Sequence, residues 1–302
     1  MNTTTVRPVI HVGVDGSWRD TGALEWALQE SLLRQEPLQA VHVIDERLRH
    51  APGWEPDAVD DASTELVDQV QQYLDAAPGT LDHEADLLVG PPARKLVDAA
   101  AGSRMLVVGR RGLGTFKRLL IGSTSEAVVT HAAHPPVPVV IVPPDWKPTD
   151  HAGPVVVAVD DSGRTTGDTT DDSAAIEFAI EAAAERNVPV RLLHVWDLPA
   201  IYSWDAMNTS SAGAEWADNA QRHFENLAAE WQNKYPETTV QVEVRRGHAV
   251  DGVVAGAEES DAQLLVVGSR HRSRLMSVLL GSVTRGALHH ATCPLAVVPV
   301  QV

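Results

Sequence analysis

The sequence predicts two tandem α/β domains, each built on an open parallel sheet, and three observations support this fold class. The chain has 302 residues, enough for two domains of about 150 residues each. It also repeats itself once, because the stretch Met105–Pro143 is similar to Leu264–Pro299, with an offset of 159 residues between Gly109 and Gly268. Within each copy, short apolar runs alternate with longer segments of helical periodicity, which is typical of βαβ units.

The strands and helices follow from the spacing of apolar residues. In the first copy, the predicted strands are Pro8–Val14, Leu38–Ile44, Leu81–Val89, Met105–Val108 and Val137–Val142. The predicted helices lie around Ala23–Leu32, Leu66–Leu74, Ala93–Ala101 and Ser123–Ala132. The second copy repeats the strands at Val155–Val159, Val190–Trp196, Val240–Val244, Leu264–Val267 and Leu295–Val300. Both final strands lie between prolines, which favours positions at sheet edges.

A segment rich in proline, Pro143–Pro154, separates the two copies and is typical of a linker. We place the boundary after Thr149, so the predicted domains span residues 1–149 and 150–302. The longest extra segment of the second copy is Gly163–Asp172. Its glycine, threonine and aspartate content indicates a polar surface loop.

The composition excludes several classes of function. There are 24 Lys and Arg residues against 41 Asp and Glu residues, and the formal charge of −17 repels the phosphates of nucleic acids and anionic lipid headgroups. The chain has one cysteine, Cys293, which excludes a disulfide framework and a multi-cysteine metal site. No window is apolar enough for a membrane span or a signal peptide. We therefore expect a cytoplasmic protein that binds neither nucleic acid nor membranes.

Other side chains that could carry chemistry favour structural roles. His131 and His134 have helical spacing but no third ligand, so we expect no metal site. Cys293 stands at the entry of an apolar strand and is interpreted as a small core residue rather than a nucleophile. The sequence leaves open whether Trp18 and Trp54 line a ligand crevice or pack in the core.

The clearest chemical signal is a glycine pattern that follows the fourth strand and opens a helix, Gly109-x2-Gly112-x9-Gly122-Ser123. Glycines allow tight turns whose amides point at a ligand, and the helix begins with unpaired amides and a run of hydroxyl side chains. In an open α/β sheet, ligands bind beyond the carboxyl ends of the strands, where Asp15 ends the first strand. The pattern predicts a phosphate pocket in which Asp15 binds ribose hydroxyls or a phosphate-bound magnesium ion.

The motifs of the commoner nucleotide-binding enzymes do not occur in this sequence. There is no G-x4-G-K-[ST] run, and Asp15-Gly16-Ser17 follows the first strand in place of G-x-G-x-x-G. Neither the Ser-Gly-Gly-x-Asp-Ser loop nor the His-x-Gly-His motif of pyrophosphate-cleaving enzymes is present, and no lysine adjoins the signature glycines. We therefore expect no catalytic residues, with slow, incidental ATP hydrolysis left open.

Three further elements accompany the glycine pattern in both copies, namely V-D-x-S after the first strand, His-Val at the end of the second, and G-x-[PA] after the third. In this order, twice, these motifs resemble the universal stress protein family, of the nucleotide-binding type and in its tandem two-domain form. The resemblance covers about Pro8–Pro143 and Pro154–Val300. It implies a Rossmann-like strand order of 3-2-1-4-5 in each domain, pseudo-twofold symmetry between the domains, and a homodimer.

The resemblance also implies ATP, with or without Mg2+, lying across the ends of the first, second and fourth strands of each domain. In the first copy, the nucleotide-binding residues that it implies are Val14, Asp15, Val43, Val108, Gly109, Arg111, Gly112, Gly122, Ser123, Thr124 and Ser125. In the second copy, they are Val159, Asp160, Val195, Val267, Gly268, Arg270, Gly281, Ser282, Val283 and Thr284.

The second copy departs from the family pattern at one signature position. His271 replaces the second glycine, so a side chain stands where the backbone should approach a phosphate. The insertion also adds Asp168, Asp171 and Asp172 near the expected triphosphate charge. We expect the first site to be closer to the family pattern and the second to be weaker, altered or empty.

The leading interpretation is an ATP-binding regulatory protein of the stress response that is not an enzyme. The alternatives are a scaffold that ignores nucleotides and a binder of cyclic AMP. An adenylate-forming enzyme is the rival from a different class, because related α/β folds bind ATP for that chemistry. Identification of the small molecule that the purified protein carries discriminates among them.

Overall fold

The computed structural model describes residues 8–49, 56–79, 82–112, 121–148, 152–160, 172–197, 206–269 and 280–299. The described residues form two compact units, one before the linker in the sequence and one after it. The predicted domain boundary, between Thr149 and Asp150, lies outside the described residues.

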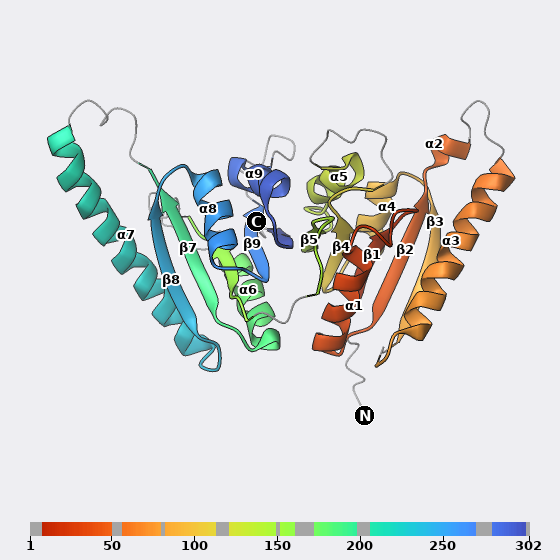
Figure 1. Cartoon of the computed structure of the whole chain (residues 1–302), viewed down its shortest axis with the longest axis horizontal. Helices are drawn as coiled ribbons and strands as arrows, with labels where there is room; N and C mark the ends of the chain where they lie inside the picture. The colour runs from red at the N-terminus through yellow and green to blue at the C-terminus, as the bar shows by residue number, and fades with distance from the viewer. Residues whose placement is uncertain are drawn as a thin grey trace. The chain divides into compact units, whose positions relative to one another are not determined.

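The first unit contains five described strands that run parallel in the order β3-β2-β1-β4-β5 (Figure 1). They are β1 (Ile10–Val14), β2 (Leu38–Ile44), β3 (His83–Val89), β4 (Met105–Gly109) and β5 (Val139–Val142). The predicted α/β class and the order 3-2-1-4-5 are therefore confirmed. The chain adds β2 and β3 on one side of β1 and then β4 and β5 on the other side. The carboxyl ends of β1 and β4 therefore lie side by side, at the point where such sheets bind ligands.

Helices cover both faces of this sheet. They are α1 (Ala23–Arg34), the short α2 (Glu46–Arg49), α3 (Pro56–Ala76), α4 (Pro92–Ala99) and α5 (Ser123–His131). A Cβ atom on Gly13 would lie 3.0 Å from Leu96 of α4, so this position of β1 faces α4. Since alternate strand residues point to opposite sides, Ile10 and Val12 face the side where α1 packs on β1.

The second unit repeats this arrangement in the order β8-β7-β6-β9-β10. Its described strands are β6 (Val155–Ala158), β7 (Val190–Trp196), β8 (Val240–Arg246), β9 (Leu264–Ser269) and β10 (Leu295–Pro299). Its described helices are α6 (Ser173–Arg186), α7 (Ala206–Lys234), α8 (Ala249–Glu259) and α9 (Ser282–His290). The predicted duplication is therefore visible as two copies of one topology.

Some strands end later than predicted, because backbone pairing with the neighbouring strand continues beyond the apolar residues. β8 runs to Arg246 instead of Val244, because Arg245 and Arg246 still pair with Val195 and Trp196 of β7. In the same way, β4 includes Gly109 and β9 includes Ser269. Charged and small residues end an apolar pattern but do not end a backbone ladder.

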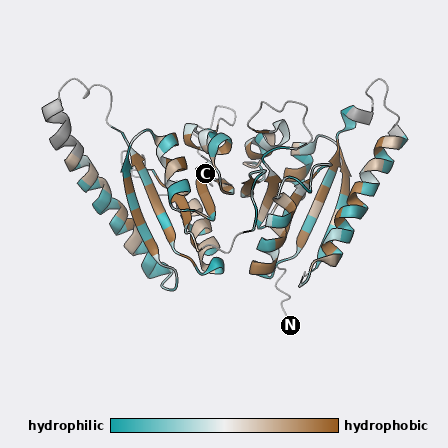
Figure 2. Ribbon diagram, in the orientation of Figure 1, coloured by the Kyte–Doolittle hydropathy of each residue, from teal (hydrophilic) through white to brown (hydrophobic). Residues whose placement is uncertain are grey.

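The apolar cores lie on both faces of the sheets, as expected when helices cover both sides of parallel strands. Met105–Val108 of β4 and Val139–Val142 of β5 are buried along their whole length. Figure 2 shows strands of largely hydrophobic residues beside helices that carry hydrophilic residues as well. Burial of each such side chain stabilises the fold by about 1.5–3 kcal/mol.

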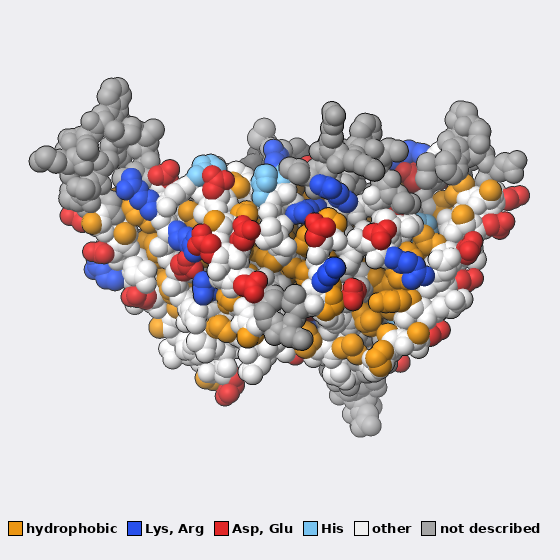
Figure 3. Space-filling model, in the orientation of Figure 1, with side chains coloured by type: hydrophobic (Ala, Val, Ile, Leu, Met, Phe, Trp, Pro, Cys, Tyr) orange, Lys and Arg blue, Asp and Glu red, His pale blue; other side chains and the backbone are white. Residues whose placement is uncertain are grey.

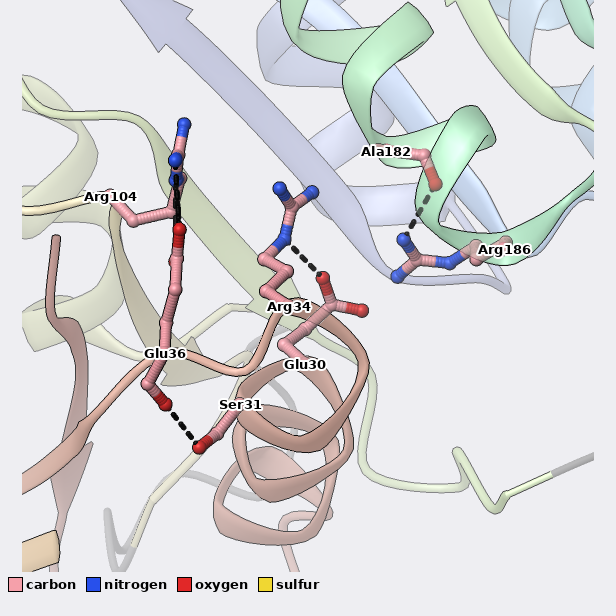
Figure 4. Close-up of polar contacts among 7 residues, drawn as sticks. All are labelled: Glu30, Ser31, Arg34, Glu36, Arg104, Ala182 and Arg186. Carbon is pink, nitrogen blue, oxygen red and sulfur yellow. Dashed lines mark hydrogen bonds and ion pairs between the residues drawn. The ribbon is translucent and has the colours of Figure 1, made fainter. Parts of the chain in front are cut away.

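Polar contacts tie the amino-terminal ends of β2 and β4 together in the first unit (Figure 4). The guanidinium of Arg104 donates to Glu36, with Nη2 lying 2.8 Å from Oε1. The hydroxyl of Ser31 donates to the carbonyl oxygen of Glu36 at 2.6 Å. Because the Glu36 side chain is 8% exposed, its charge needs this partner. These contacts lie at the opposite end of the sheet from the predicted site.

Charged side chains of both signs are interspersed over the face shown in Figure 3, where Lys and Arg alternate with Asp and Glu. Among the described residues, no helix combines the length and the apolar composition that crossing a membrane requires.

Candidate functional site

Asp15 follows the last residue of β1 and lies beside the end of β4. Its Oδ1 atom accepts hydrogen bonds from the Ser17 amide at 2.9 Å and from the Ser17 hydroxyl at 2.5 Å. Such a local turn is typical of aspartate at a strand end. It leads into a tight loop in which the amide of Trp18 donates to the carbonyl oxygen of Asp15 at 2.9 Å.

The segment after β4 packs closely against this loop, and two glycines make the contact possible. A Cβ atom on Gly112 would lie 2.1 Å from Oδ2 of Asp15, and one on Gly109 would lie 2.8 Å from Cβ of Thr21. A side chain at Gly112 would therefore displace the Asp15 carboxylate, and one at Gly109 would displace Thr21. The two loops that the sequence predicts to share one crevice do meet.

The two halves of the glycine pattern are also joined to each other. The amide of Gly122 donates to the carbonyl oxygen of Arg110 at 2.8 Å, and the hydroxyl of Ser125 donates to the carbonyl oxygen of Gly109 at 2.7 Å. Ser125 is 6% exposed. The Gly122 amide and the Ser125 hydroxyl, which the sequence suggests as ligand contacts, thus hold the loop in place.

The start of α5 offers donors of another kind. Its N-cap is Gly122, which has no side chain that could cap the helix. Ser123 and Thr124 are exposed in the first turn. The amides of a first turn have no partner within the helix, and the helix dipole places partial positive charge there. This end of α5 is therefore suited to a phosphate group.

Two arginines add positive charge beside these amides. Burial lowers the pKa of Arg110, and the charge of Arg111 lowers that pKa further, while Asp145 raises it. Within the part of the chain that the structure describes, the Nε atom of Arg111 is buried and has no hydrogen-bond partner. Buried polar atoms normally have partners. An anion next to Arg111 would satisfy this nitrogen and relieve the repulsion between the two guanidinium groups.

Apolar residues at the strand ends border the same region. Val14 and Val108 are buried at 8% and 5% exposure, and Val43 is half-buried at the end of β2. The Nδ1 atom of His42 lies 2.9 Å from the carbonyl oxygen of Val14. Because a carbonyl can only accept, His42 donates this hydrogen bond and fixes the peptide just before Asp15.

The second unit reproduces part of this geometry. The Thr284 hydroxyl donates to the carbonyl oxygen of Gly268 at 3.3 Å, matching Ser125 and Gly109. The Nδ1 atom of His194 lies 3.0 Å from the carbonyl oxygen of Val159. The ring of His194 also packs on Phe224, with 4.5 Å between centroids.

The end of β6 differs in its charge. The amide of Asp160 donates to the carboxylate of Asp172 at 2.8 Å, which brings a second carboxylate beside the predicted site. Val267 is buried, Val195 and Val283 are half-buried, and Ser282 is exposed at the start of α9. The candidates Arg270, His271, Asp168 and Asp171 lie outside the described residues.

Comparison with known proteins decides the family. The model of the universal stress protein family matches residues 8–143 and again residues 152–299. The chain belongs to the universal stress protein family. It is 30% identical to a universal stress protein of Mycolicibacterium smegmatis, over 96% of this chain and 96% of that relative, and 31% identical to one of Mycobacterium tuberculosis, over 95% of each.

Solved structures agree with this assignment at the level of the fold. The crystal structure of a universal stress protein from Archaeoglobus fulgidus superimposes with a TM-score of 0.72 at 20% sequence identity, covering 97% of this chain and 98% of that one. The tandem two-domain form that the motifs imply is therefore confirmed for this universal stress protein.

Sequence reasoning missed the role of the histidine in the His-Val element. His42 and His194 occupy equivalent positions, and each holds the carbonyl before the aspartate that ends the first strand of its unit. The signal was the recurrence of His-Val in both copies. Only the register of β1 with β2 and of β6 with β7 shows what the imidazole contacts.

The remaining candidates of this universal stress protein have structural positions. Trp18 is 6% exposed and packs edge-on against Tyr73 of α3, with 5.2 Å between ring centroids, so it belongs to the core; Trp54 lies outside the described residues. Cys293 is half-buried rather than a fully buried core residue, and burial of its thiol raises the pKa to about 12, so little nucleophilic thiolate is present near neutral pH. Among the described residues, no group of three or more His, Cys, Asp or Glu side chains could hold a metal ion.

Proposed function

We propose that this universal stress protein is an ATP-binding regulatory protein of the stress response. The nucleotide would lie across the ends of β1, β2 and β4 in the first unit and of the equivalent strands in the second. One observation supports this most strongly. The segments Gly109–Gly112 and Gly122–Ser125, which nine residues separate in the sequence, are bonded to each other next to the carboxylate of Asp15.

The groups of the first unit match the parts of a nucleotide. The first-turn amides of α5 and the guanidinium of Arg111 suit the phosphates. The Asp15 carboxylate suits the ribose hydroxyls, while Val14, Val43 and Val108 suit the base. A magnesium ion accompanying the phosphates would keep several waters, and the Asp15 carboxylate, which lies against Gly112, would supply a protein oxygen ligand.

The second unit should bind nucleotide more weakly than the first. The carboxylate of Asp172 accepts from the amide of Asp160, so the second unit has one more carboxylate near the expected phosphates than the first unit has. The sequence adds His271 in place of the signature glycine. We therefore assign the main nucleotide site to the first unit.

The proposed role is regulation rather than catalysis. The described donors of the first unit suit binding of phosphate rather than its transfer, and no lysine adjoins the signature glycines to stabilise charge in phosphoryl transfer. ATP regulates only if it binds one conformation of the protein more tightly than another. Homodimer formation and a cytoplasmic location stay predictions.

The first experiment identifies the ligand that the purified protein carries. The protein is denatured, and the released small molecules are identified by mass spectrometry. Release of ATP supports the proposal, while AMP or cyclic AMP assigns the same site to a different nucleotide. If nothing is released and added ATP does not bind, the protein is a scaffold that does not use nucleotides. Conversion of ATP to AMP and pyrophosphate with an acceptor would show an adenylate-forming enzyme.

A matched pair of variants then locates the main site. Asp15→Asn should weaken ATP binding about tenfold, because a hydrogen bond to a charged group contributes about 1.5–3 kcal/mol. Asp160→Asn, at the equivalent position of the second unit, should leave the tight binding unchanged. Calorimetric titration of both variants measures this. Two equally tight ATP molecules per wild-type chain would contradict the assignment to the first unit.

A further inference from the structure

The start of the linker, residues Pro143–Pro148, contacts the loops of the proposed nucleotide site. It forms a turn in which the amide of Trp146 donates to the carbonyl oxygen of Pro143 at 3.1 Å. Just before this turn, the carbonyl oxygen of Val142 accepts a hydrogen bond from the amide of Arg110 at 2.7 Å. The carbonyl oxygen of Arg110 accepts from Gly122, so this one residue after β4 bonds both to the start of α5 and to the end of β5, where the linker segment begins.

Trp146 makes a second contact, with the loop after β1. A Cβ atom on Gly22 would lie 3.2 Å from the carbonyl oxygen of Trp146 and 3.3 Å from its indole ring. Gly22 has a φ of 68°, a left-handed conformation that side chains disfavour, and it directly precedes α1. The preceding residue, Thr21, is the one that packs against Gly109. The loop after β1 is therefore held between the glycine pattern and the linker segment.

A charge interaction across space accompanies the packing. Asp145 of the linker segment raises the pKa of Arg110, against the effects of burial and of Arg111. An anion bound next to Arg111 would change the balance of charge around Arg110 and therefore its attraction to Asp145. The residue equivalent to Arg110 in the second unit is Ser269, which is 7% exposed and carries no charge. This arrangement belongs to the first unit.

We propose that the linker segment is energetically coupled to the nucleotide loop of the first unit, so that bound nucleotide stabilises the turn at Pro143–Trp146. This inference rests on the proposed function. Because coupling between two sites is reciprocal, an intact linker segment must in turn strengthen nucleotide binding. The chain continues through this segment into the second unit, so occupancy of the first site would alter the tether between the two units.

Hydrogen exchange of the full-length protein, measured by mass spectrometry at increasing ATP concentrations, tests the coupling. Peptides with residues 109–112 and 121–125 report binding to the first unit. Peptides with the amides of Asp145, Trp146 and Lys147 report the linker segment. We expect ATP to slow exchange in both regions with the same midpoint concentration.

Variants test the reciprocal effect. Asp145→Asn removes the charge next to Arg110, and Trp146→Ala removes the contact with Gly22. Each should raise the ATP midpoint of peptides 109–112 by about fivefold or more, the range typical of coupled sites. Lys147→Ala, an exposed neighbour in the same segment, is the matched control and should keep the wild-type midpoint. Thermal unfolding checks that all three variants remain folded.

The outcomes separate the two proposals. If ATP protects residues 109–112 while the linker amides exchange as before, the coupling is wrong and the nucleotide site stands. Equal midpoints for the wild type, Asp145→Asn and Trp146→Ala would also overturn the coupling. If ATP protects neither region and does not bind, the proposed function fails, and the coupling fails with it.

Discussion

Gly112 and Asp15 are in direct contact, because a Cβ atom on Gly112 would lie 2.1 Å from Oδ2 of Asp15. This relationship gives the glycine of the family pattern a physical reason in this chain. The backbone after β4 approaches the carboxylate after β1 so closely that a side chain at Gly112 would have to displace this carboxylate. In the second copy the equivalent residue in the sequence is His271.

Gly112→Ala should weaken ATP binding at the first site. A methyl group at Gly112 would push the Asp15 carboxylate out of its present position, and the loss of a hydrogen bond to a charged group costs about 1.5–3 kcal/mol. If that cost falls on the bound conformation, the affinity decreases about ten- to a hundredfold. Titration with ATP measures the change.

Gly281→Ala is the matched control for this substitution. The nearest atom that its methyl group would meet is Oγ1 of Thr284 at 3.8 Å, an ordinary contact. We expect this variant to fold and to bind ATP at the first site as the wild type does. Unchanged affinity in Gly112→Ala would show that the contact with Asp15 does not shape the site.

Ser125→Ala should lower stability by about 1 kcal/mol, because it leaves the carbonyl oxygen of Gly109 without the hydroxyl that lies 2.7 Å away. Ser125→Thr should keep most of the stability, since Thr284 makes the equivalent bond to Gly268. Urea unfolding of the two variants measures the difference. Equal losses in both would assign the effect to packing instead of the hydrogen bond.

His11 should make stability depend on pH. It is 5% exposed on β1, with Nδ1 lying 2.8 Å from the hydroxyl of Ser103. Burial lowers the pKa of His11, which the hydrogen bond with Gln39 and the charge of Asp86 oppose. Below about pH 6.5, the unfolded chain binds this proton more readily than the folded protein does, so stability decreases as the pH falls.

The slope from this single group is at most about 1.4 kcal/mol per pH unit. Val156 occupies the equivalent position of β6, where it is fully buried, so His11→Val is a substitution that the fold already accommodates. Urea unfolding between pH 5 and 8 should show a shallower dependence on pH in His11→Val than in the wild type. Identical curves would mean that His11 does not titrate in this range.

Cys293 is half-buried, and its thiol should react with thiol reagents much more slowly in the folded protein than after unfolding. Burial raises the pKa of its thiol to about 12, so the thiolate near neutral pH is about a thousandfold scarcer than in an unfolded chain. Because this is the only cysteine, labelling with iodoacetamide at pH 8 followed by mass spectrometry reads this site alone. Rapid labelling of the native protein would contradict the burial of the thiol.

Several features of this universal stress protein could be predicted because their signals are local. Apolar periodicity indicated the strands, and the repeated series of strands indicated two copies of one topology. The spacing of Gly109, Gly112 and Gly122 located the loops that meet Asp15. Strand ends such as Arg246 could not be predicted, because pairing with a neighbouring strand determines them.

The sequence by itself determined the fold class, the duplication, the family and the glycine pattern, since each depends on the type and spacing of residues along the chain. Only the tertiary structure decided which polar groups are engaged. It showed that Gly122 and Ser125 hold the loop, that His42 fixes the carbonyl of Val14, and that Trp146 lies against Gly22. Hydrogen bonds and packing join atoms that are close in space, and residues far apart in sequence become neighbours only when the sheet forms.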